Sequence, residues 1–256
     1  MKDLPTMAIT TGDAFLLDEL ISRRFVEACP GYVPVRFPTV MPVRLLEKKF
    51  EEEDWLVKAP GKKGLEYVLT PEGTTIFAEL LENPGFPRRI IYPNLQCVRE
   101  NAFFQLGLED VGDYTMEGVA RVMGTANSYL SSLGLKGGKD YVFELNDLDI
   151  LRGYLRGIGL KEGDIPVVLK ELDRTASAIK KGQGSGEDFA RKMNAYGREA
   201  AKLQQLIGLS SFPGWLKASS QNMGQMEELQ NKLSGIPYVL NPALARGLSY
   251  YEAEPP

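Results

Sequence analysis

Residues 88–112 have the sequence RRIIYPNLQCVRENAFFQLGLEDVG, which predicts the central element of the fold. Both of its halves are rich in the β-branched and aromatic residues that are typical of strands. We predict two strands with a very short connection at Glu100–Asn101. Strands joined by so short a connection run antiparallel, so we expect an antiparallel hairpin here.

Helices and further strands are expected on both sides of the hairpin. Asp13 can cap a helix, and the apolar residues after it recur at helical spacing. Residues 31–42 contain strand-forming residues and three prolines, which predicts an edge strand or a bend. The expected helices are 13–28, 71–83 with Pro71 in its first turn, 116–135 and 148–159, and the other expected strands are 65–70, 141–147 and 236–241. Mostly antiparallel strands with helices packed against them make an α+β fold.

The composition divides the chain into three segments. Residues 161–235 are rich in Lys, Gln and Ala and have helical patterns, with a glycine-rich loop at 180–188. We therefore predict a core over 1–160, a helical insertion over 161–235, and a return to the core sheet over 236–256.

The bulk composition is that of an ordinary globular protein. The 256 residues are 43% hydrophobic and 25% charged, and the formal charge of −4 gives no overall basic surface for nucleic acid. Two cysteines, Cys29 and Cys97, are too few for a disulfide framework or a structural zinc site. The N-terminal residues have no apolar signal core, and no stretch approaches eighteen apolar residues. We expect a cytoplasmic protein without membrane association.

The absence of histidine limits the chemistry. It removes the histidine-dependent nucleophile triads, the commonest transition-metal ligand and the commonest general base. Reactions must then use carboxylates, Arg, Lys, Tyr and backbone groups. Phosphoryl and nucleotidyl transfer, which depend on positioning and charge neutralisation, fit this restriction. We predict no metal site made by the protein itself.

Four motifs point to one family. They are LTPEGT at 69–74, CVRE at 97–100, QLGLE at 105–109 and LARGLSYY at 244–251. In this order they resemble the catalytic core of histidyl-tRNA synthetase, a class II aminoacyl-tRNA synthetase. With the helix 116–135 and the helical insertion, the resemblance covers most of the chain. It implies a class II synthetase-like, mostly antiparallel sheet flanked by helices.

The resemblance also implies an amino-acid pocket. Glu72 and Glu109 would supply the negative charge that a substrate ammonium needs, and Gln105 would hydrogen-bond in the same region. The substrate-binding residues that the resemblance implies are Glu72, Thr74, Gln105, Glu109, Tyr250 and Tyr251.

Two arginines carry the implied chemistry. Arg99 would meet the ATP α-phosphate through a charge-assisted contact, with Glu100 beside it at the nucleotide. Arg246 would neutralise charge at the reacting carboxylate and phosphate. The substrate carboxylate is itself the nucleophile in that family, so the reaction needs no protein base.

Each motif alone has a simpler interpretation. Pro-Glu-Gly-Thr is also an ordinary turn before a helix, and Arg99-Glu100 is also a common surface pair. Gln105 and Glu109 share one face of a strand and could both face solvent. Tyr250 and Tyr251 could be surface aromatics. The order and spacing of all four motifs favour the family.

The sequence departs from the family mainly at the ATP site. Only Asn101 and Ala102 separate Arg99-Glu100 from Phe103, where the family has a longer motif 2 loop that covers ATP. No counterpart of the motif 3 arginine or of an anticodon-binding domain follows LARGLSYY. Thr70 and Ser249 replace an arginine and an aspartate. The amino-acid pocket is therefore better preserved than the ATP site.

Three functions follow from this asymmetry. The first is a synthetase paralogue that binds an amino acid, with histidine as the candidate, and regulates a partner enzyme, as the regulatory subunit of ATP phosphoribosyltransferase does in histidine biosynthesis. The second is a trimmed or split ligase of the histidine–tRNA ligase type, which would use ATP with Mg²⁺ to form an aminoacyl-adenylate. The third is a dimerisation scaffold with a vestigial pocket.

The expected partners follow the same resemblance. Residues 31–42 correspond to motif 1, with Pro38 as its proline, so we expect a homodimer. Lysines and arginines in 161–205 could touch RNA, but a solvated helix face is the preferred interpretation, and tRNA is not an expected partner.

Overall fold

The structure is a computed structural model that describes residues 12–45, 56–60, 66–98, 101–218 and 223–245. The chain divides into two compact units, Met1–Leu135 and Lys136–Pro256. This division reflects packing, whereas the predicted segments 1–160, 161–235 and 236–256 reflect composition and stay a prediction. In the described parts of the chain, no helix is both long and apolar enough to cross a membrane.

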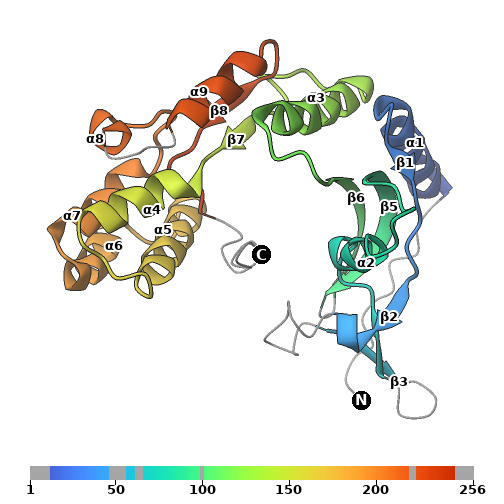
Figure 1. The fold of residues 1–256 in the computed structure, drawn as a ribbon, viewed down its shortest axis with the longest axis horizontal. Coiled ribbons are helices and arrows are strands. Elements are labelled where there is room, and N and C mark those ends of the chain that lie inside the picture. Colours follow the sequence, from blue (N-terminus) through green and yellow to red (C-terminus); the bar gives the residue numbers. More distant parts are fainter. Residues whose placement is uncertain (1–11, 46–55, 61–65, 99–100, 219–222, 246–256) are drawn as a thin grey trace. The chain divides into compact units, whose positions relative to one another are not determined.

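The predicted hairpin is confirmed and forms the main sheet of the first unit (Figure 1). Strand β5 (Arg89–Val98) runs antiparallel to β6 (Asn101–Asp110), and β1 (Val33–Pro34) pairs with β5 in parallel. The β5–β6 register extends to the pair Val98↔Asn101, which leaves only residues 99–100 between the paired strands.

A second small sheet in this unit has the order β2–β4–β3 and is antiparallel. Its strands are β2 (Val40–Pro42), β3 (Lys58–Pro60) and β4 (Glu66–Leu69), with a 3₁₀ turn, η1 (Val43–Leu45), after β2. Residues 31–42 thus form two short strands in two different sheets, as the bend predicted from the prolines requires.

Helices cover the two faces of the β5–β6 hairpin. On one face Phe25 of α1 (Gly12–Ala28) packs with Ile91, and its ring meets Tyr129 of α3 (Met116–Ser132) edge to face at 5.1 Å. On the other face Phe77 of α2 (Thr74–Leu80) packs with the neighbouring β5 residues. Alternation of side chains along β5 explains why consecutive residues enter different cores.

The predicted helix boundaries differ in detail. Helix α2 begins at Thr74 after an N-cap at Gly73, so the placement of Pro71 in its first turn was wrong. Helix α3 begins after Thr115, whose hydroxyl accepts a hydrogen bond from the Gly118 amide. It ends at Ser132, before Gly134 in the left-handed conformation with φ +85°.

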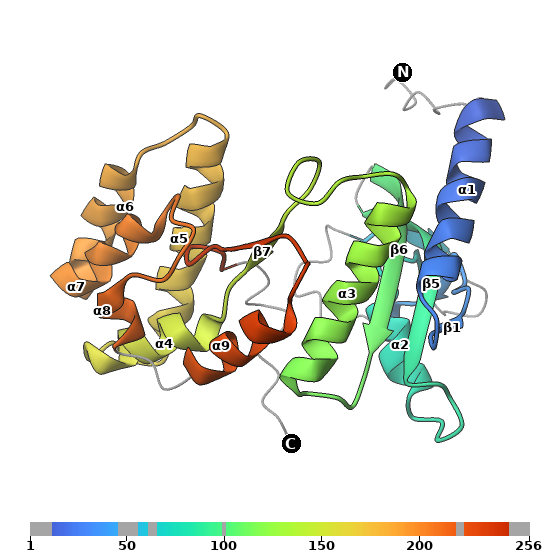
Figure 2. The ribbon, with the colours of Figure 1, turned by 90° about the horizontal axis from the view of Figure 1, so that it is seen from above.

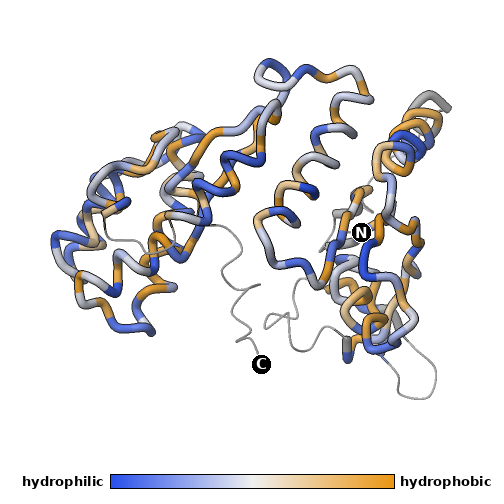
Figure 3. The backbone as a smooth tube through the Cα atoms, turned by 45° about the horizontal axis from the view of Figure 1, so that its top comes forward, coloured by the Kyte–Doolittle hydropathy of each residue, from blue (hydrophilic) through white to orange (hydrophobic). Residues whose placement is uncertain are grey.

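The second unit is helical around a large apolar core (Figure 2). Apolar residues recur along its helices between polar ones, which places one stripe of each helix in the core (Figure 3). This confirms the helical character predicted for 161–235. The helices are α4 (Leu148–Gly157), α5 (Ile165–Lys180), α6 (Gly186–Met193), η3 (Asn194–Tyr196), α7 (Arg198–Ala201), η4 (Lys202–Leu206), α8 (Gly214–Lys217) and α9 (Met223–Lys232).

Two short parallel strands flank these helices in the sequence. Strand β7 (Phe143–Leu145) pairs with β8 (Tyr238–Leu240), so the chain before and after the helical segment meets in one small sheet. The mixture of helices and strands predicted from the sequence is confirmed. Parallel and antiparallel pairs both occur among the described strands, so a mostly antiparallel sheet stays a prediction.

Candidate functional site

Two of the predicted motifs meet at the start of α2. The Thr74 hydroxyl donates a hydrogen bond of 2.7 Å to Oε1 of Glu109 on β6. Glu72 lies two residues before Thr74, and its Oε1 accepts a hydrogen bond from the Thr75 hydroxyl. Strand β6 and the turn before α2 thus bring together Glu72, Thr74 and Glu109, all three predicted to bind substrate.

Tyr92 of β5 completes this cluster. Its side chain is buried, at 1% exposure, and its hydroxyl donates a hydrogen bond of 3.0 Å to the same Oε1 of Glu109. Burial and the nearby charge of Glu109 raise the pKa of Tyr92 far above its usual value. The phenol therefore remains neutral and acts as a hydrogen-bond donor to the carboxylate.

Tyr92 is not among the residues predicted from the sequence, although two glycines signal it. A Cβ atom on Gly73 would lie 2.3 Å from the Tyr92 ring, and one on Gly107 would lie 2.0 Å from it. These are the glycines of Pro-Glu-Gly-Thr and of Gln-Leu-Gly-Leu-Glu. Both motifs thus need glycine for the same reason, since the ring occupies the space that a side chain would take.

Gln105 lies on the same strand face but further along the hairpin. It pairs with Asn94, whereas Gly107 pairs with Tyr92 and Glu109 with Ile90. Four residues of an antiparallel strand span about 13 Å, so Gln105 does not contact the Glu109 carboxylate. The structure therefore places Gln105 at one end of the site and the acidic residues at the other.

Buried amides continue this face. Asn94 is buried, and Gln96 is 1% exposed, with an Nε2 that has no hydrogen-bond partner in the described structure. Neither residue is among those predicted from the sequence. Thr70, which stands where the family has arginine, donates a hydrogen bond of 2.6 Å to the Pro38 carbonyl and so ties the motif to the strand region before it.

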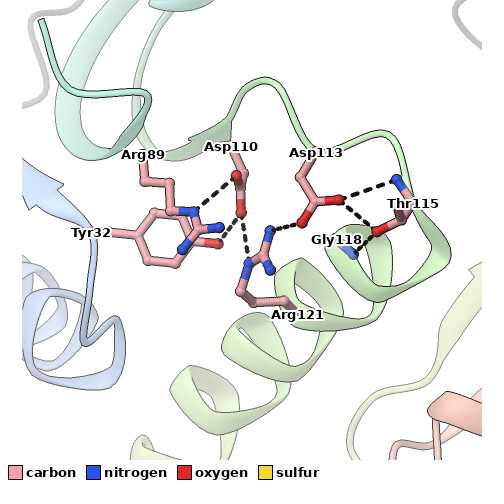
Figure 4. A network of polar contacts seen from close by, with 7 residues as sticks. All are labelled: Tyr32, Arg89, Asp110, Asp113, Thr115, Gly118 and Arg121. Carbon is pink, nitrogen blue, oxygen red and sulfur yellow. Dashed lines mark hydrogen bonds and ion pairs between the residues drawn. The ribbon is translucent and has the colours of Figure 1, made fainter.

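The opposite face of β6 carries a different carboxylate, Asp110 (Figure 4). Its Oδ2 accepts hydrogen bonds from the Tyr32 hydroxyl at 2.9 Å and from Arg121 Nε at 2.9 Å, and its Oδ1 accepts one from Arg89 Nε at 3.2 Å. The Asp110 side chain is only 4% exposed. Burial alone would raise its pKa, but the bonds from Arg121 and Tyr32 and the two guanidinium charges outweigh burial and lower it.

Arg121 also joins Asp110 to a second carboxylate. Its Nη2 donates a hydrogen bond of 2.8 Å to Asp113, which in turn accepts one from the Thr115 amide (Figure 4). Bonds from Thr115 and Arg121 lower the pKa of Asp113 to about 2. These contacts fix the start of α3 against the end of β6, so this network has a structural role.

One cavity in the second unit is lined by a carboxylate that already has partners. A cavity of about 280 Å³ includes Glu144, which accepts hydrogen bonds from Lys180 at 3.0 Å and from Asn241 at 2.7 Å. Beside it, Asn146 donates a hydrogen bond of 2.7 Å to the Leu244 carbonyl. This bond holds the backbone at the beginning of the LARGLSYY motif.

Several predicted site residues lie outside the described residues. They are Arg99, Glu100, Arg246, Tyr250 and Tyr251, and their roles stay predictions. Among the described residues, no group of three or more Cys, Asp and Glu side chains is close enough to hold a metal ion. ATP with Mg²⁺ likewise stays a prediction that depends on the ligase function.

Comparison with known proteins gives two kinds of relatives. No protein-family model matches the chain. It is 26% identical over 179 residues to an ATP phosphoribosyltransferase regulatory subunit from Ruminiclostridium cellulolyticum, covering 62% of this chain and 42% of that protein. It is 26% identical over 262 residues to a histidine–tRNA ligase from Methanocaldococcus jannaschii, covering 93% of this chain and 62% of the ligase.

The fold agrees with these relatives. An ATP phosphoribosyltransferase regulatory subunit/histidyl-tRNA synthetase structure from Bacillus halodurans matches with a TM-score of 0.78 and 17% identity, over 95% of this chain and 69% of that chain. The predicted resemblance to the histidyl-tRNA synthetase-like core is therefore confirmed, and the fold is class II synthetase-like. The chain spans about two fifths of the regulatory subunit and three fifths of the ligase.

Proposed function

We propose that this chain is a histidyl-tRNA synthetase-like paralogue that binds an amino acid, with histidine as the candidate, and acts as a regulatory subunit of ATP phosphoribosyltransferase. Its similarity to a regulatory subunit of that enzyme supports this function. The observation that carries the proposal is the contrast between an assembled amino-acid end of the site and a very short β5–β6 connection.

The amino-acid end has the chemistry that an ammonium group needs. Thr74 and Tyr92 hold the Glu109 carboxylate in one orientation, and Glu72 lies close enough to Tyr92 for its charge to raise the pKa of the phenol. The hydroxyl donors on Glu109 are neutral, so among the described residues no cation pairs with this carboxylate. Glu109, with Glu72 near it, would bind the ammonium of an amino acid by charge-assisted hydrogen bonds.

At the nucleotide end of the site, the connection between β5 and β6 is too short to form a loop that covers ATP. Strand pairing continues to Val98↔Asn101, so the connection has two residues, 99 and 100. By resemblance, a class II synthetase uses a longer loop here to cover ATP. A site that retains the amino-acid end and has only this connection is suited to sensing an amino acid rather than activating it.

A histidine–tRNA ligase function is the second candidate. The alignment with the Methanocaldococcus jannaschii ligase, which extends over 93% of this chain, favours it. Arg99, with Glu100, and Arg246 would then act on ATP and the reacting carboxylate, as the resemblance implies, with Mg²⁺ as the accompanying ion. Adenylation would require these residues to work without a longer motif 2 loop.

The proposed assembly follows from the regulatory function. The partner would be the catalytic subunit of ATP phosphoribosyltransferase, in the cytoplasm. A homodimer would form through residues 31–42, with Pro38 in motif 1, and would extend the short sheets towards the mostly antiparallel sheet implied by the resemblance. Among the described strands, β1 lies at the edge of its sheet, where a strand of a second chain could pair with it.

Two parallel measurements separate the candidate functions. ATP–pyrophosphate exchange is measured with each of the twenty amino acids, and binding of the same amino acids is measured by calorimetry. The regulatory function predicts that histidine binds and that no amino acid supports exchange. Exchange with histidine would overturn it in favour of the ligase.

The partner is tested with the catalytic subunit of ATP phosphoribosyltransferase from the same genome. The regulatory function predicts a stable complex in size-exclusion chromatography and a catalytic rate that responds to added histidine. A catalytic subunit whose migration and histidine response are the same with and without this chain would contradict the proposed partnership.

A further inference from the structure

We propose that Tyr92 is a positioning residue. It packs against the glycines of Pro-Glu-Gly-Thr and Gln-Leu-Gly-Leu-Glu and orients the Glu109 carboxylate towards the ligand. This inference rests on the proposed function, because it specifies how the amino-acid end of the site is built. Three segments far apart in the sequence meet at its ring, namely the turn before α2, β5 and β6.

The ring is held between two backbone segments. Its hydroxyl end would lie 2.8 Å from a Cβ on Gly73 and 2.5 Å from a Cβ on Gly107. Both distances are too short for a real side chain, and the ring is fully buried. The ring also packs against Phe37, with the ring centroids 4.7 Å apart. Tyr92 therefore has one available position, and its hydroxyl is fixed relative to both motifs.

The hydroxyl acts on one oxygen of Glu109. Oε1 accepts two hydrogen bonds, from Tyr92 at 3.0 Å and from Thr74 at 2.7 Å. Within the described parts of the chain, Oε2 of Glu109 has no partner. Because both protein donors occupy Oε1, the carboxylate cannot rotate without losing them, and Oε2 is left to accept a hydrogen bond from the ligand. The ligand group at this point is an ammonium or another N–H donor.

Tyr32 provides a matched control. Its hydroxyl also donates to a β6 carboxylate, Asp110, at 2.9 Å, but on the other face of the strand. Asp110 also binds two arginines, so both of its carboxylate oxygens accept hydrogen bonds from the protein. The same substitution, Tyr to Phe, therefore removes one phenol–carboxylate hydrogen bond on each face, and only the bond from Tyr92 concerns the ligand.

The first experiment measures L-histidine binding by calorimetry to the full chain and to the variants Tyr92→Phe and Tyr32→Phe, with melting temperatures in parallel. We expect Tyr92→Phe to bind about tenfold more weakly, since a hydrogen bond to a charged group is lost, while its ring still fills the space beside the glycines. Tyr32→Phe should bind like the unaltered chain. Equal affinity in Tyr92→Phe and the unaltered chain would overturn the role of Tyr92.

A double-mutant cycle separates positioning from general stability. If Tyr92 acts through Glu109, the double variant Tyr92→Phe/Glu109→Ala, in which residue 109 has no acceptor, should bind no more weakly than Glu109→Ala alone, as measured by ligand-observed NMR up to millimolar histidine. Additive losses of affinity would show that Tyr92 acts independently of Glu109, and the inference would fail. A variant that merely loosened the fold would give such additive losses.

The glycine contact is tested by stability alone. Gly107→Ala should lower the melting temperature of the unaltered chain, because the new methyl group meets the Tyr92 ring. In the Tyr92→Ala background the same substitution should lower the melting temperature much less, because the ring is absent. An equal decrease in both backgrounds would overturn the glycine contact.

These experiments also distinguish the two levels of the proposal. If none of the twenty amino acids binds the unaltered chain, the proposed function itself fails, and with it the role of Tyr92. If histidine binds the unaltered chain and Tyr92→Phe with equal affinity, the proposed function stands and only the positioning role of Tyr92 is overturned.

Discussion

Glu109 and Asp110 are neighbours on β6, yet the two carboxylates have opposite environments. Asp110 faces α1 and α3, is 4% exposed, and accepts hydrogen bonds from two arginines and a tyrosine. Glu109 faces α2 and accepts two hydrogen bonds from hydroxyl groups, both on one oxygen. A carboxylate that is paired with arginines stabilises the fold, whereas a carboxylate that is bound only by hydroxyl groups can pair with a ligand cation.

The largest expected effect is on stability, at Asp110. Asp110→Ala removes the buried carboxylate that Arg89 and Arg121 share, and the loss of these charge-assisted hydrogen bonds should cost about 3 kcal/mol of unfolding free energy. Urea denaturation followed by circular dichroism measures this loss. A loss below about 1 kcal/mol would mean that the network contributes no more than a surface ion pair.

The second effect is on binding, at Glu109. Glu109→Gln retains an oxygen that can accept from Thr74 and Tyr92 but removes the charge, so L-histidine should bind about 30-fold more weakly. The unfolding free energy should change little. Calorimetry at constant pH measures the affinity, and an unaltered dissociation constant would remove Glu109 from the ligand site.

The third effect is a dependence of stability on pH. The pKa values of Asp110 and Asp113 are lowered in the folded protein, to about 2 for Asp113, from an unfolded value of about 4. Their stabilisation is therefore present above about pH 4 and is lost as the pH falls through the folded values. Urea midpoints at pH 6 and pH 3 should differ less in the double variant Asp110→Asn/Asp113→Asn than in the unaltered chain. Equal differences would assign the acid sensitivity to other groups.

The smallest effect is expected at an exposed ion pair of the second unit. Arg156 donates to Glu162 from Nε, but the two side chains are 52% and 70% exposed. Arg156→Ala should therefore change the unfolding free energy by no more than about 0.5 kcal/mol. A change as large as that at Asp110 would show that burial does not determine how much an ion pair contributes to the unfolding free energy.

The hairpin and the helices could be predicted because their signals are local. Alternating strand residues on both sides of a short connection specify β5 and β6, and apolar spacing specifies α3 and α4. Three of the predicted ligand residues, Glu72, Thr74 and Glu109, belong to motifs that the structure brings together, and their role in ligand binding stays a prediction.

Tyr92 could not be located in the same way. A tyrosine in a strand is an ordinary strand residue. Its role depends on Gly73 and Gly107, which lie 19 residues before it and 15 residues after it in the sequence. The helix start was predicted at Pro71, whereas α2 begins at Thr74 after the N-cap Gly73. The role of Tyr92 depends on contacts between distant segments, which no local pattern shows.

Amino-acid binding through the Glu109 face of β6 can be tested by a calorimetric titration of L-histidine into the unaltered full chain, Glu109→Gln and Asp110→Asn. We expect saturable binding that is weakened in Glu109→Gln and retained in Asp110→Asn, although the latter melts at a lower temperature. No binding to the unaltered chain, or equal affinity in Glu109→Gln and the unaltered chain, would show that the Glu109 face does not bind the amino acid.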